Sequence, residues 1–147
     1  MMIALGSDHG GFALKEIILD HLVSAGKKVK DHGVFTEDSI DYPDIAYSVV
    51  QSLQSGESSY GILICGTGIG MAIAANKHRG MRAALCSEPV SARLAREHND
   101  ANILTMGSRI IGYSLAIEIV DTFLEACFQG GRHKRRLDKI SHLDLFR

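Results

Sequence analysis

The sequence predicts an α/β fold. We expect a single-domain, three-layer α/β/α arrangement around a five-stranded, parallel, Rossmann-like sheet, with an extra helix at the C-terminus. The main observation is that short apolar runs alternate about five times with longer segments of helical spacing. Glycines or prolines separate most of these segments, as is usual at the ends of strands and helices. No linker, low-complexity tract or internal repeat divides the chain, so we expect one domain over residues 1–147.

The first half of the chain is expected to hold two strand–helix pairs. Residues 2–6 form an apolar strand, and two glycines break it before a helix over 12–23. Residues 28–31 form a weaker strand. A turn-rich loop then leads to a helix over 45–53, whose first turn suits Pro43, with Asp41 or Tyr42 near its N-cap. Four apolar side chains of the first helix can share its buried side: Phe12, Ile17, Leu19 and Leu22.

The second half begins with the clearest strand, Tyr60–Cys65, an apolar run typical of strands buried on both faces. A glycine loop leads from it into a helix over 71–76. Pro89 favours a helix start, so residues 90–97 should form the next helix, with Ser87 or Glu88 near its N-cap. The remaining expected elements are strands over 81–86 and 102–106, an amphipathic helix over 112–126, and a final helix over 132–145.

Composition and charge argue against several functional classes. Hydrophobic residues make up 46% and charged residues 22%, and the formal net charge is −1, so no global field favours nucleic acid or a membrane. The charge-dense stretch Arg132–Arg136 is too short to favour nucleic-acid binding by itself. Three cysteines without CxxC spacing argue against a disulfide framework or a zinc site and favour a reducing, cytoplasmic setting. Cys86 and Cys127 are expected in the core.

No secretion signal or membrane span is expected either. Asp8 and His9 interrupt the first apolar run early, and no uninterrupted apolar run approaches the roughly 18 residues that a membrane helix needs.

The most informative feature is Cys65, which is placed where the third strand ends and a glycine loop opens a helix. Backbone N–H groups at a helix N-terminus are unpaired and carry partial positive charge. They favour a thiolate over a thiol, and they favour an oxyanion that forms beside it. We therefore expect Cys65 to act as a base or nucleophile beside an anion site. The alternative is an inert buried cysteine.

The glycine loop itself does not spell a known nucleotide motif. Gly66, Gly68 and Gly70 give G-x-G-x-G rather than the dinucleotide-binding G-x-G-x-x-G. A Walker A loop would end in Gly-Lys-Ser/Thr, and a cysteine phosphatase loop would carry an arginine where Met71 stands. The remaining possibilities are a small anion-binding loop next to a thiol and a purely structural turn.

Further polar residues should gather at the same edge of the sheet, because ligands bind beyond the carboxyl ends of parallel strands. The pair Asp8–His9 follows the first strand, as either a helix cap with a surface histidine or a substrate contact. Arg109 follows the fifth strand. Tyr42 either packs the loop or reaches the site. His98–Asn99 lies at the far end of a helix, and we interpret it as either a polar helix end or a catalytic pair.

The final helix carries a possible phosphate site. Arg132 and Arg136 are four residues apart and share one helix face. Such a face is either solvated or, because two guanidinium groups point the same way, suited to a phosphate. Arg135 lies at a spacing that is also compatible with this face.

Eight short motifs occur together along nearly the whole chain. They are residues 6–12 (GSDHGGF), 41–43 (DYP), 64–70 (ICGTGIG), 76–77 (NK), 86–89 (CSEP), 98–102 (HNDAN), 107–109 (GSR) and 130–133 (GGRH). Jointly they resemble the B-type ribose-5-phosphate isomerases, a sugar-phosphate isomerase family that also includes the galactose-6-phosphate isomerase subunits. Some members replace the cysteine with a glutamate further along the loop. This chain has Cys65 and no acid at 70–73, so it resembles the cysteine type.

The resemblance implies an aldose–ketose isomerase of D-ribose 5-phosphate and D-ribulose 5-phosphate, of the pentose phosphate pathway, without a metal or organic cofactor. It also implies a homodimer with sites built from both subunits. Cys65 would move the proton between C2 and C1, and His98 would act in ring opening. The implied substrate-binding residues are Asp8, His9, Tyr42, Gly66, Thr67, Gly68, Ile69, Gly70, Asn99, Arg109, Arg132 and Arg136.

Within that set, Thr67 and Asp8 would handle hydroxyl protons and Asn99 would hold sugar oxygens. His9 and the three arginines would bind the phosphate or line its site. The alternatives are an isomerase of a six-carbon sugar phosphate, such as allose or galactose 6-phosphate, and a non-catalytic phosphate- or nucleotide-binding module. A thiol-based hydrolase is a weaker third.

Overall fold

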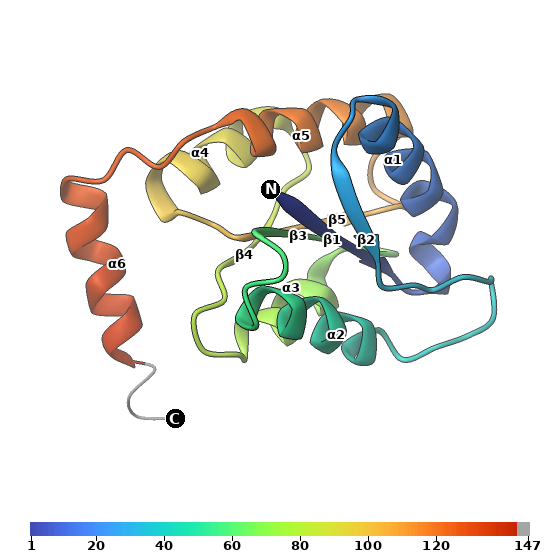
Figure 1. Cartoon of the computed structure of the whole chain (residues 1–147), viewed down its shortest axis with the longest axis horizontal. Helices are drawn as coiled ribbons and strands as arrows, with labels where there is room; N and C mark the ends of the chain where they lie inside the picture. The colour runs from blue at the N-terminus through green and yellow to red at the C-terminus, as the bar shows by residue number, and fades with distance from the viewer. Residues whose placement is uncertain (144–147) are drawn as a thin grey trace.

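Five parallel strands form the centre of the computed structural model, which describes residues 1–143 (Figure 1). The order across the sheet is β2-β1-β3-β5-β4, and every neighbouring pair is parallel. The strands are β1 (Met2–Ser7), β2 (Lys28–Asp31), β3 (Tyr60–Cys65), β4 (Ala83–Leu85) and β5 (Ile103–Gly107). The predicted five-stranded parallel sheet is confirmed.

Helices cover both faces of this sheet, as predicted. On one face lie α1 (Phe12–Ser24), α4 (Pro89–Asn99) and α5 (Tyr113–Glu125), and on the other lie α2 (Tyr42–Gln54) and α3 (Ile69–Asn76) (Figure 1). A short 3-10 helix, η1 (His9–Gly11), connects β1 to α1. The last helix, α6 (Arg132–Leu143), stands at the side of the molecule and packs against α4 (Figure 1).

Two hydrophobic clusters fill the spaces between the layers, one on each face of the sheet. The alternation of side chains along a strand decides which cluster each residue joins. In β3, Ile62 and Ile64 join the cluster under α1 and α5, whereas Leu63 and Cys65 join the cluster under α2 and α3. The direction of the Cys65 side chain therefore follows from its place in the strand.

The chain reverses direction across the sheet between β1 and β3. It runs from β1 outward to β2, and α2 then carries it back to β3 on the other side of β1. In such sheets the loops after the two strands diverge and leave a crevice at their carboxyl ends. The segments 8–11 and 66–70 border that crevice.

Several expected boundaries and one expected buried face were wrong. Ile17 is 39% exposed, and the fully covered positions of α1 include Lys15 and Leu22. The buried side is rotated because Lys15 can be buried against Asp31, with which it forms an ion pair. Helix α2 begins at Tyr42, before residue 45, but Asp41 is its N-cap and Pro43 lies in its first turn, as expected.

In the second half of the chain, α3 begins at Ile69, two residues earlier than expected, because the glycine loop turns directly into the helix. Strand β4 keeps only residues 83–85 of the expected 81–86, since it is a short edge strand. Cys127 is exposed rather than in the core, because α5 ends at Glu125. Glu88 is the N-cap of α4, one of the two expected. Residues 144 and 145 of the expected final helix lie outside the described residues.

Candidate active site

Three loops meet at the carboxyl edge of the sheet and are joined by hydrogen bonds. The Ser108 hydroxyl, after β5, donates to the carbonyl of Gly10 at 2.6 Å and lies 3.2 Å from the carbonyl of Cys65. The Ser108 N–H also donates to Cys65 O at 2.9 Å, and Arg109 N–H donates to Gly66 O at 3.0 Å. The loops after β1, β3 and β5 therefore form one rigid surface around the end of β3.

Close packing of this surface depends on glycine. Gly68 has a φ of +80°, and a Cβ there would lie 2.7 Å from the carbonyl carbon of Met106 and 2.6 Å from Leu85 Cδ1. Gly107 has the reciprocal constraint, because its Cβ would lie 2.6 Å from the carbonyl carbon of Thr67. The loop thus lies directly on the backbone at the end of β5, closer than any side chain allows.

Cys65 lies beneath this loop. The residue is only 5% exposed, and its Sγ accepts a hydrogen bond from the Gly68 N–H at 3.1 Å. The sulfur therefore faces the glycine loop. Burial raises the pKa of the Cys86 thiol and disfavours a thiolate there.

The loop also presents backbone N–H groups. The first intrahelical hydrogen bond of α3 runs from Ala72 N–H to Gly68 O at 3.1 Å. The N–H groups of Gly70 and Met71 therefore have no acceptor inside the helix. The Ile69 N–H donates to the exposed Thr67 hydroxyl at 3.3 Å. This first turn of α3 is suited to hold a negative charge beside the Cys65 sulfur.

Four further sequence-predicted side chains border the same loop. Asp8 is buried, and its Oδ1 accepts the Gly11 N–H at 3.0 Å, so it caps η1. His9 is exposed, and its Nδ1 accepts the Ile40 N–H at 3.4 Å. The remaining two lie against loop glycines. The Tyr42 ring lies 2.7 Å from where a Cβ of Gly70 would be, and the Arg109 guanidinium Nε lies 3.5 Å from that of Gly66.

The other predicted site residues lie elsewhere in the same chain. His98 and Asn99 end α4, and Arg132 and Arg136 are exposed on α6. The His98 ring stacks on the His133 ring with centroids 4.2 Å apart and 6° between planes. This contact brings His98 next to the arginine-bearing face of α6.

His133 was not expected as part of any site, although it lies between Arg132 and Arg136, which were both expected as site residues. It is buried, and Arg132 Nε donates to its Nε2 at 3.5 Å. Burial lowers the pKa of His133, and the neighbouring charges of His98, Arg132 and Arg136 lower it further. The stacked His98 and His133 rings link α4 to α6.

The two groups of site residues lie at opposite ends of the strands. Cys65 pairs with Gly107, the last residue of β5, whereas α4 leads into Ile103, its first residue. At about 3.3 Å per residue, the two ends of β5 are about 13 Å apart. Within one chain, Cys65 and His98 are thus too far apart to act on the same sugar carbon atoms by direct contact.

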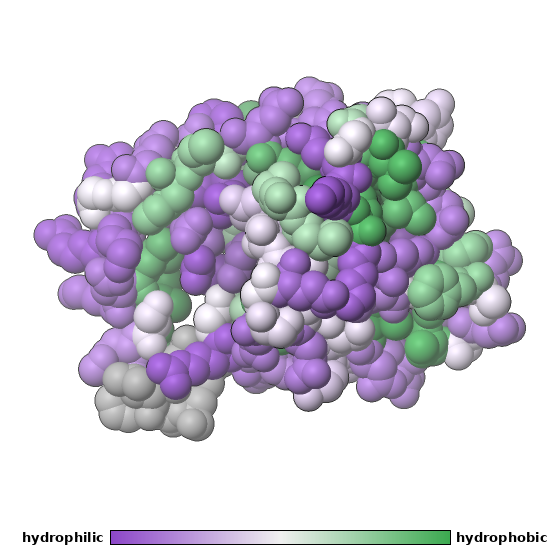
Figure 2. All heavy atoms as spheres, viewed as in Figure 1, coloured by the Kyte–Doolittle hydropathy of each residue, from purple (hydrophilic) through white to green (hydrophobic). Residues whose placement is uncertain are grey.

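A groove of about 390 Å³ separates α6 from the edge of the sheet. Figure 2 shows the molecule hollowed beside α6. Apolar side chains of α6, including Leu137 and Ile140, line one wall, and Arg82 and Asn99 are among the residues of the other. The groove lies near the His98 group and away from Cys65.

Two kinds of feature are absent from the described residues. No group of three or more His, Cys, Asp or Glu side chains within residues 1–143 is arranged to hold a metal ion. Over the same range, no helix has both the length and the apolar character needed to cross a bilayer.

Comparison with known proteins assigns the chain to a family. A family model described as Ribose/Galactose Isomerase matches residues 3–140. Ribose-5-phosphate isomerase B of Escherichia coli is 50% identical over 142 residues, covering 97% of this chain and 95% of that protein.

Two solved structures are also similar. Ribose-5-phosphate isomerase B of Clostridium thermocellum superposes with a TM-score of 0.97 at 52% identity, covering 99% of this chain and 98% of that one. The Mycoplasma genitalium enzyme, solved with bound ribulose-5-phosphate, gives a TM-score of 0.93 at 45% identity, covering 98% and 96%.

Proposed function

Because the chain belongs to the ribose/galactose isomerase family, we propose that it interconverts D-ribose 5-phosphate and D-ribulose 5-phosphate through an enediolate. The observation that carries the proposal is the Cys65 sulfur beneath a loop of helix N-terminal N–H groups, at the point where the strand order reverses. This arrangement supplies a base and an oxyanion site within a few ångströms of each other. An odd number of cysteines without CxxC spacing also favours a reducing compartment, so we propose a cytoplasmic enzyme.

The chemical step needs only these groups and the substrate. Cys65 removes the proton from C2 of the open-chain aldose, and the electron pair forms the C1–C2 double bond of the enediolate. The negative charge goes to the carbonyl oxygen, which the N–H groups of Gly70 and Met71 can hold, at about 3–4 kcal/mol for a well-placed donor. The same sulfur then returns the proton to C1, and Thr67 and Asp8 exchange the hydroxyl protons.

The remaining groups open the ring and hold the substrate. His98 protonates the ring oxygen as the furanose opens, and Asn99 binds the sugar hydroxyls. His9, Arg109, Arg132 and Arg136 surround the phosphate. Because the phosphate is remote from C1 and C2, its binding free energy can position the sugar against Cys65 without any change at the reacting atoms.

We propose that the active site is shared between two subunits of a homodimer. Cys65 pairs with the last residue of β5, and α4 leads into its first residue, about 13 Å away along the strand. This separation supports a shared site, since direct proton transfer needs contacts of about 3 Å. Exposed apolar side chains also favour an interface: Ile69 and Ile73 on α3 and Leu85 on β4 are each more than 40% exposed. The partner subunit would bring its own α4 end and α6 to the Cys65 loop.

Proton exchange tests the role of Cys65. The Cys65→Ala variant should bind ribulose 5-phosphate but no longer incorporate deuterium from solvent at C1, with a loss of at least about 100-fold. Cys127→Ala is the matched control, because Cys127 is exposed and lies in the loop after α5. Near-normal exchange in Cys65→Ala would refute the assignment of the base. Binding without turnover in the unchanged protein, measured with chelator present, would favour a non-catalytic phosphate-binding module.

Complementation tests the shared site. Co-expressed Cys65→Ala and His98→Ala chains should regain activity, because half of the dimers would hold one site with both residues intact. At full exchange the mixture should reach about a quarter of the unchanged activity. If each site lay within one chain, every site would lack one residue and no activity would return. The same assay with five- and six-carbon sugar phosphates tests substrate length.

A further inference from the structure

The turn that follows His98 and Asn99 has an unusual residue. Asp100 has φ 45° and ψ 42°, and it is the one residue other than glycine with positive φ among residues 1–143. Glycine commonly occupies this position at a helix end, because it has no Cβ to strain the left-handed backbone. Aspartate is among the few other residues that adopt this conformation, because its short polar side chain can form hydrogen bonds nearby.

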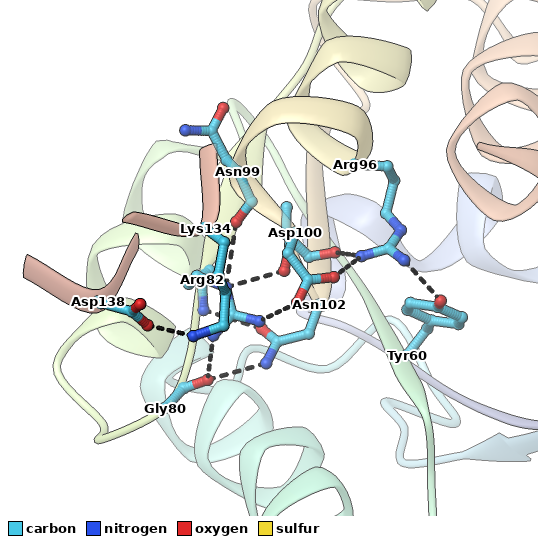
Figure 3. Close-up of polar contacts among 10 residues, drawn as sticks. Tyr60, Gly80, Arg82, Arg96, Asn99, Asp100, Asn102, Lys134 and Asp138 are labelled. Carbon is cyan, nitrogen blue, oxygen red and sulfur yellow. Dashed lines mark hydrogen bonds and ion pairs between the residues drawn. The ribbon is translucent and has the colours of Figure 1, made fainter. Parts of the chain in front are cut away.

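The Asp100 carboxylate binds two arginines, as Figure 3 shows. Its Oδ2 accepts a hydrogen bond from Arg82 Nη2 at 2.9 Å, and its Oδ1 accepts one from Arg96 Nη1 at 2.8 Å. Arg82 Nε also donates to the main-chain carbonyls of Asn99, at 3.1 Å, and of Asp100, at 2.8 Å. In Figure 3 the Asn99 amide points away from the arginines while its carbonyl faces Arg82. Arg82 therefore fixes the backbone at Asn99 and leaves the Asn99 side-chain amide pointing away from the arginines.

Both arginines are themselves anchored to the body of the fold. Arg96 is 5% exposed, and its guanidinium lies 4.6 Å from the centre of the Tyr60 ring. Its Nη2 donates to the hydroxyl of the same tyrosine at 2.7 Å. Tyr60 is the first residue of β3, the strand that ends at Cys65. Arg82 is held through its own N–H, which donates to Asn102 Oδ1 at 2.8 Å. The helix end is therefore tied to β3 and to the edge of the sheet.

We propose that Arg82, Arg96 and Asp100 form a clamp at the end of α4 that positions His98 for the neighbouring active site. None of the three lies at the Cys65 edge, so they act as positioning residues and do not touch substrate in that chain. A displacement of about 1 Å in a catalytic group can cost about 100-fold in rate. The position of His98 matters because this side chain must meet groups that another chain holds. This inference rests on the proposed function.

The chemistry of the two substrates separates this role from a general loss of structure. Ribose 5-phosphate exists mainly as a furanose ring and must be opened, which is the step assigned to His98. Ribulose 5-phosphate has no free hydroxyl that can close a furanose, so its exchange of the C1 proton needs Cys65 but no ring opening. A displaced His98 should therefore slow turnover of the aldose more than deuterium exchange into the ketose.

Three variants test the clamp. Asp100→Gly removes the carboxylate and relieves the backbone, and Asp100→Asn keeps an acceptor oxygen in a residue that tolerates this conformation. Arg93→Ala is the control, because it breaks the exposed Arg93–Glu97 pair on the same helix. We expect Asp100→Gly to lower kcat/KM for ribose 5-phosphate by about 10- to 100-fold, with exchange within about threefold. Asp100→Asn should lower kcat/KM for ribose 5-phosphate less than Asp100→Gly does. Arg93→Ala should change neither this kcat/KM nor the exchange rate.

A double mutant completes the test. If the clamp acts through His98, adding Asp100→Gly to His98→Ala should cause no further loss. Additive losses, or equal losses in aldose turnover and ketose exchange, would overturn the proposal. Unchanged kinetics in Asp100→Gly would do the same. If Asp100→Gly does not fold, the comparison is made with Asp100→Asn. An unchanged protein that does not isomerise would instead refute the proposed function.

Discussion

Replacing Gly68 by alanine should reduce both stability and turnover, and the structure gives the size of each effect. The new Cβ would have to adopt a φ of +80°, which costs an L-residue about 1–2 kcal/mol. It would also lie 2.7 Å from the carbonyl carbon of Met106, and such overpacking costs about 1–3 kcal/mol. The summed loss in the free energy of unfolding is about 2–5 kcal/mol, which for a chain of this size lowers Tm by about 4–20 °C.

The matched control is Gly56→Ala. Gly56 has a similar φ of +76°, but nothing lies within 4 Å of its hypothetical Cβ. This variant should therefore lose only the backbone part, about 1–2 kcal/mol. The difference between the two variants isolates the close approach of the loop to β5. Both should be measured at the same protein concentration, because the Tm of an oligomer depends on it.

Turnover provides the second measurement. The Gly68 N–H donates to the Cys65 sulfur, and the loop leads into the first turn of α3, so a shift of the loop misplaces base and N–H donors together. We expect kcat to fall by about 100- to 1,000-fold in Gly68→Ala and to be unchanged in Gly56→Ala. Equal Tm losses in the two variants would refute the packing argument. Normal kcat in a folded Gly68→Ala would refute the catalytic role of the loop.

Three further outcomes are expected. Lys15→Met removes a fully buried ammonium whose Nζ lies 2.5 Å from Asp31 Oδ2. Urea unfolding should show that the free energy of unfolding falls by about 3 kcal/mol. A much smaller fall would contradict the structural importance of this ion pair. The pKa of His133 is lowered, so the folded chain binds fewer protons than the unfolded one as pH falls below about 6.5. Tm should therefore fall between pH 7.5 and 5.5, and this fall should be smaller in His133→Asn. Arg136→Ala should raise KM for ribose 5-phosphate by about 10-fold, with a smaller change in kcat. Arg135→Ala should leave KM unchanged, and the reverse result would assign the phosphate contact to Arg135.

Periodicity was sufficient to predict most of the fold. The alternation of apolar runs with helical segments predicted all five strands and the helices between them, because each run buries its own side chains whatever its neighbours are. The errors concern positions where a distant residue decides. Ile17 was assigned to the buried side of α1, but Lys15 takes that side because Asp31, on a neighbouring strand, neutralises its charge. No local pattern contains that information.

The clamp around Asp100 could not be predicted for a similar reason. Arg82, Arg96 and Asp100 are ordinary polar residues in the sequence, and Tyr60 is a strand residue far from them in the chain. Their contacts exist only because β3, β5 and α4 are brought together by the sheet. His133 likewise lies in a charged stretch that predicts a solvated helix face, yet its ring is buried against His98.

The sequence by itself determined the class of fold, the strand that carries Cys65 and the glycine loop after it, because these depend on local spacing and on backbone conformations that only certain residues adopt. The tertiary structure decided that Cys65 points beneath the loop and that His98 lies at the opposite end of the sheet. Strand order and side-chain alternation set those directions, and both arise from pairing between segments far apart in the chain.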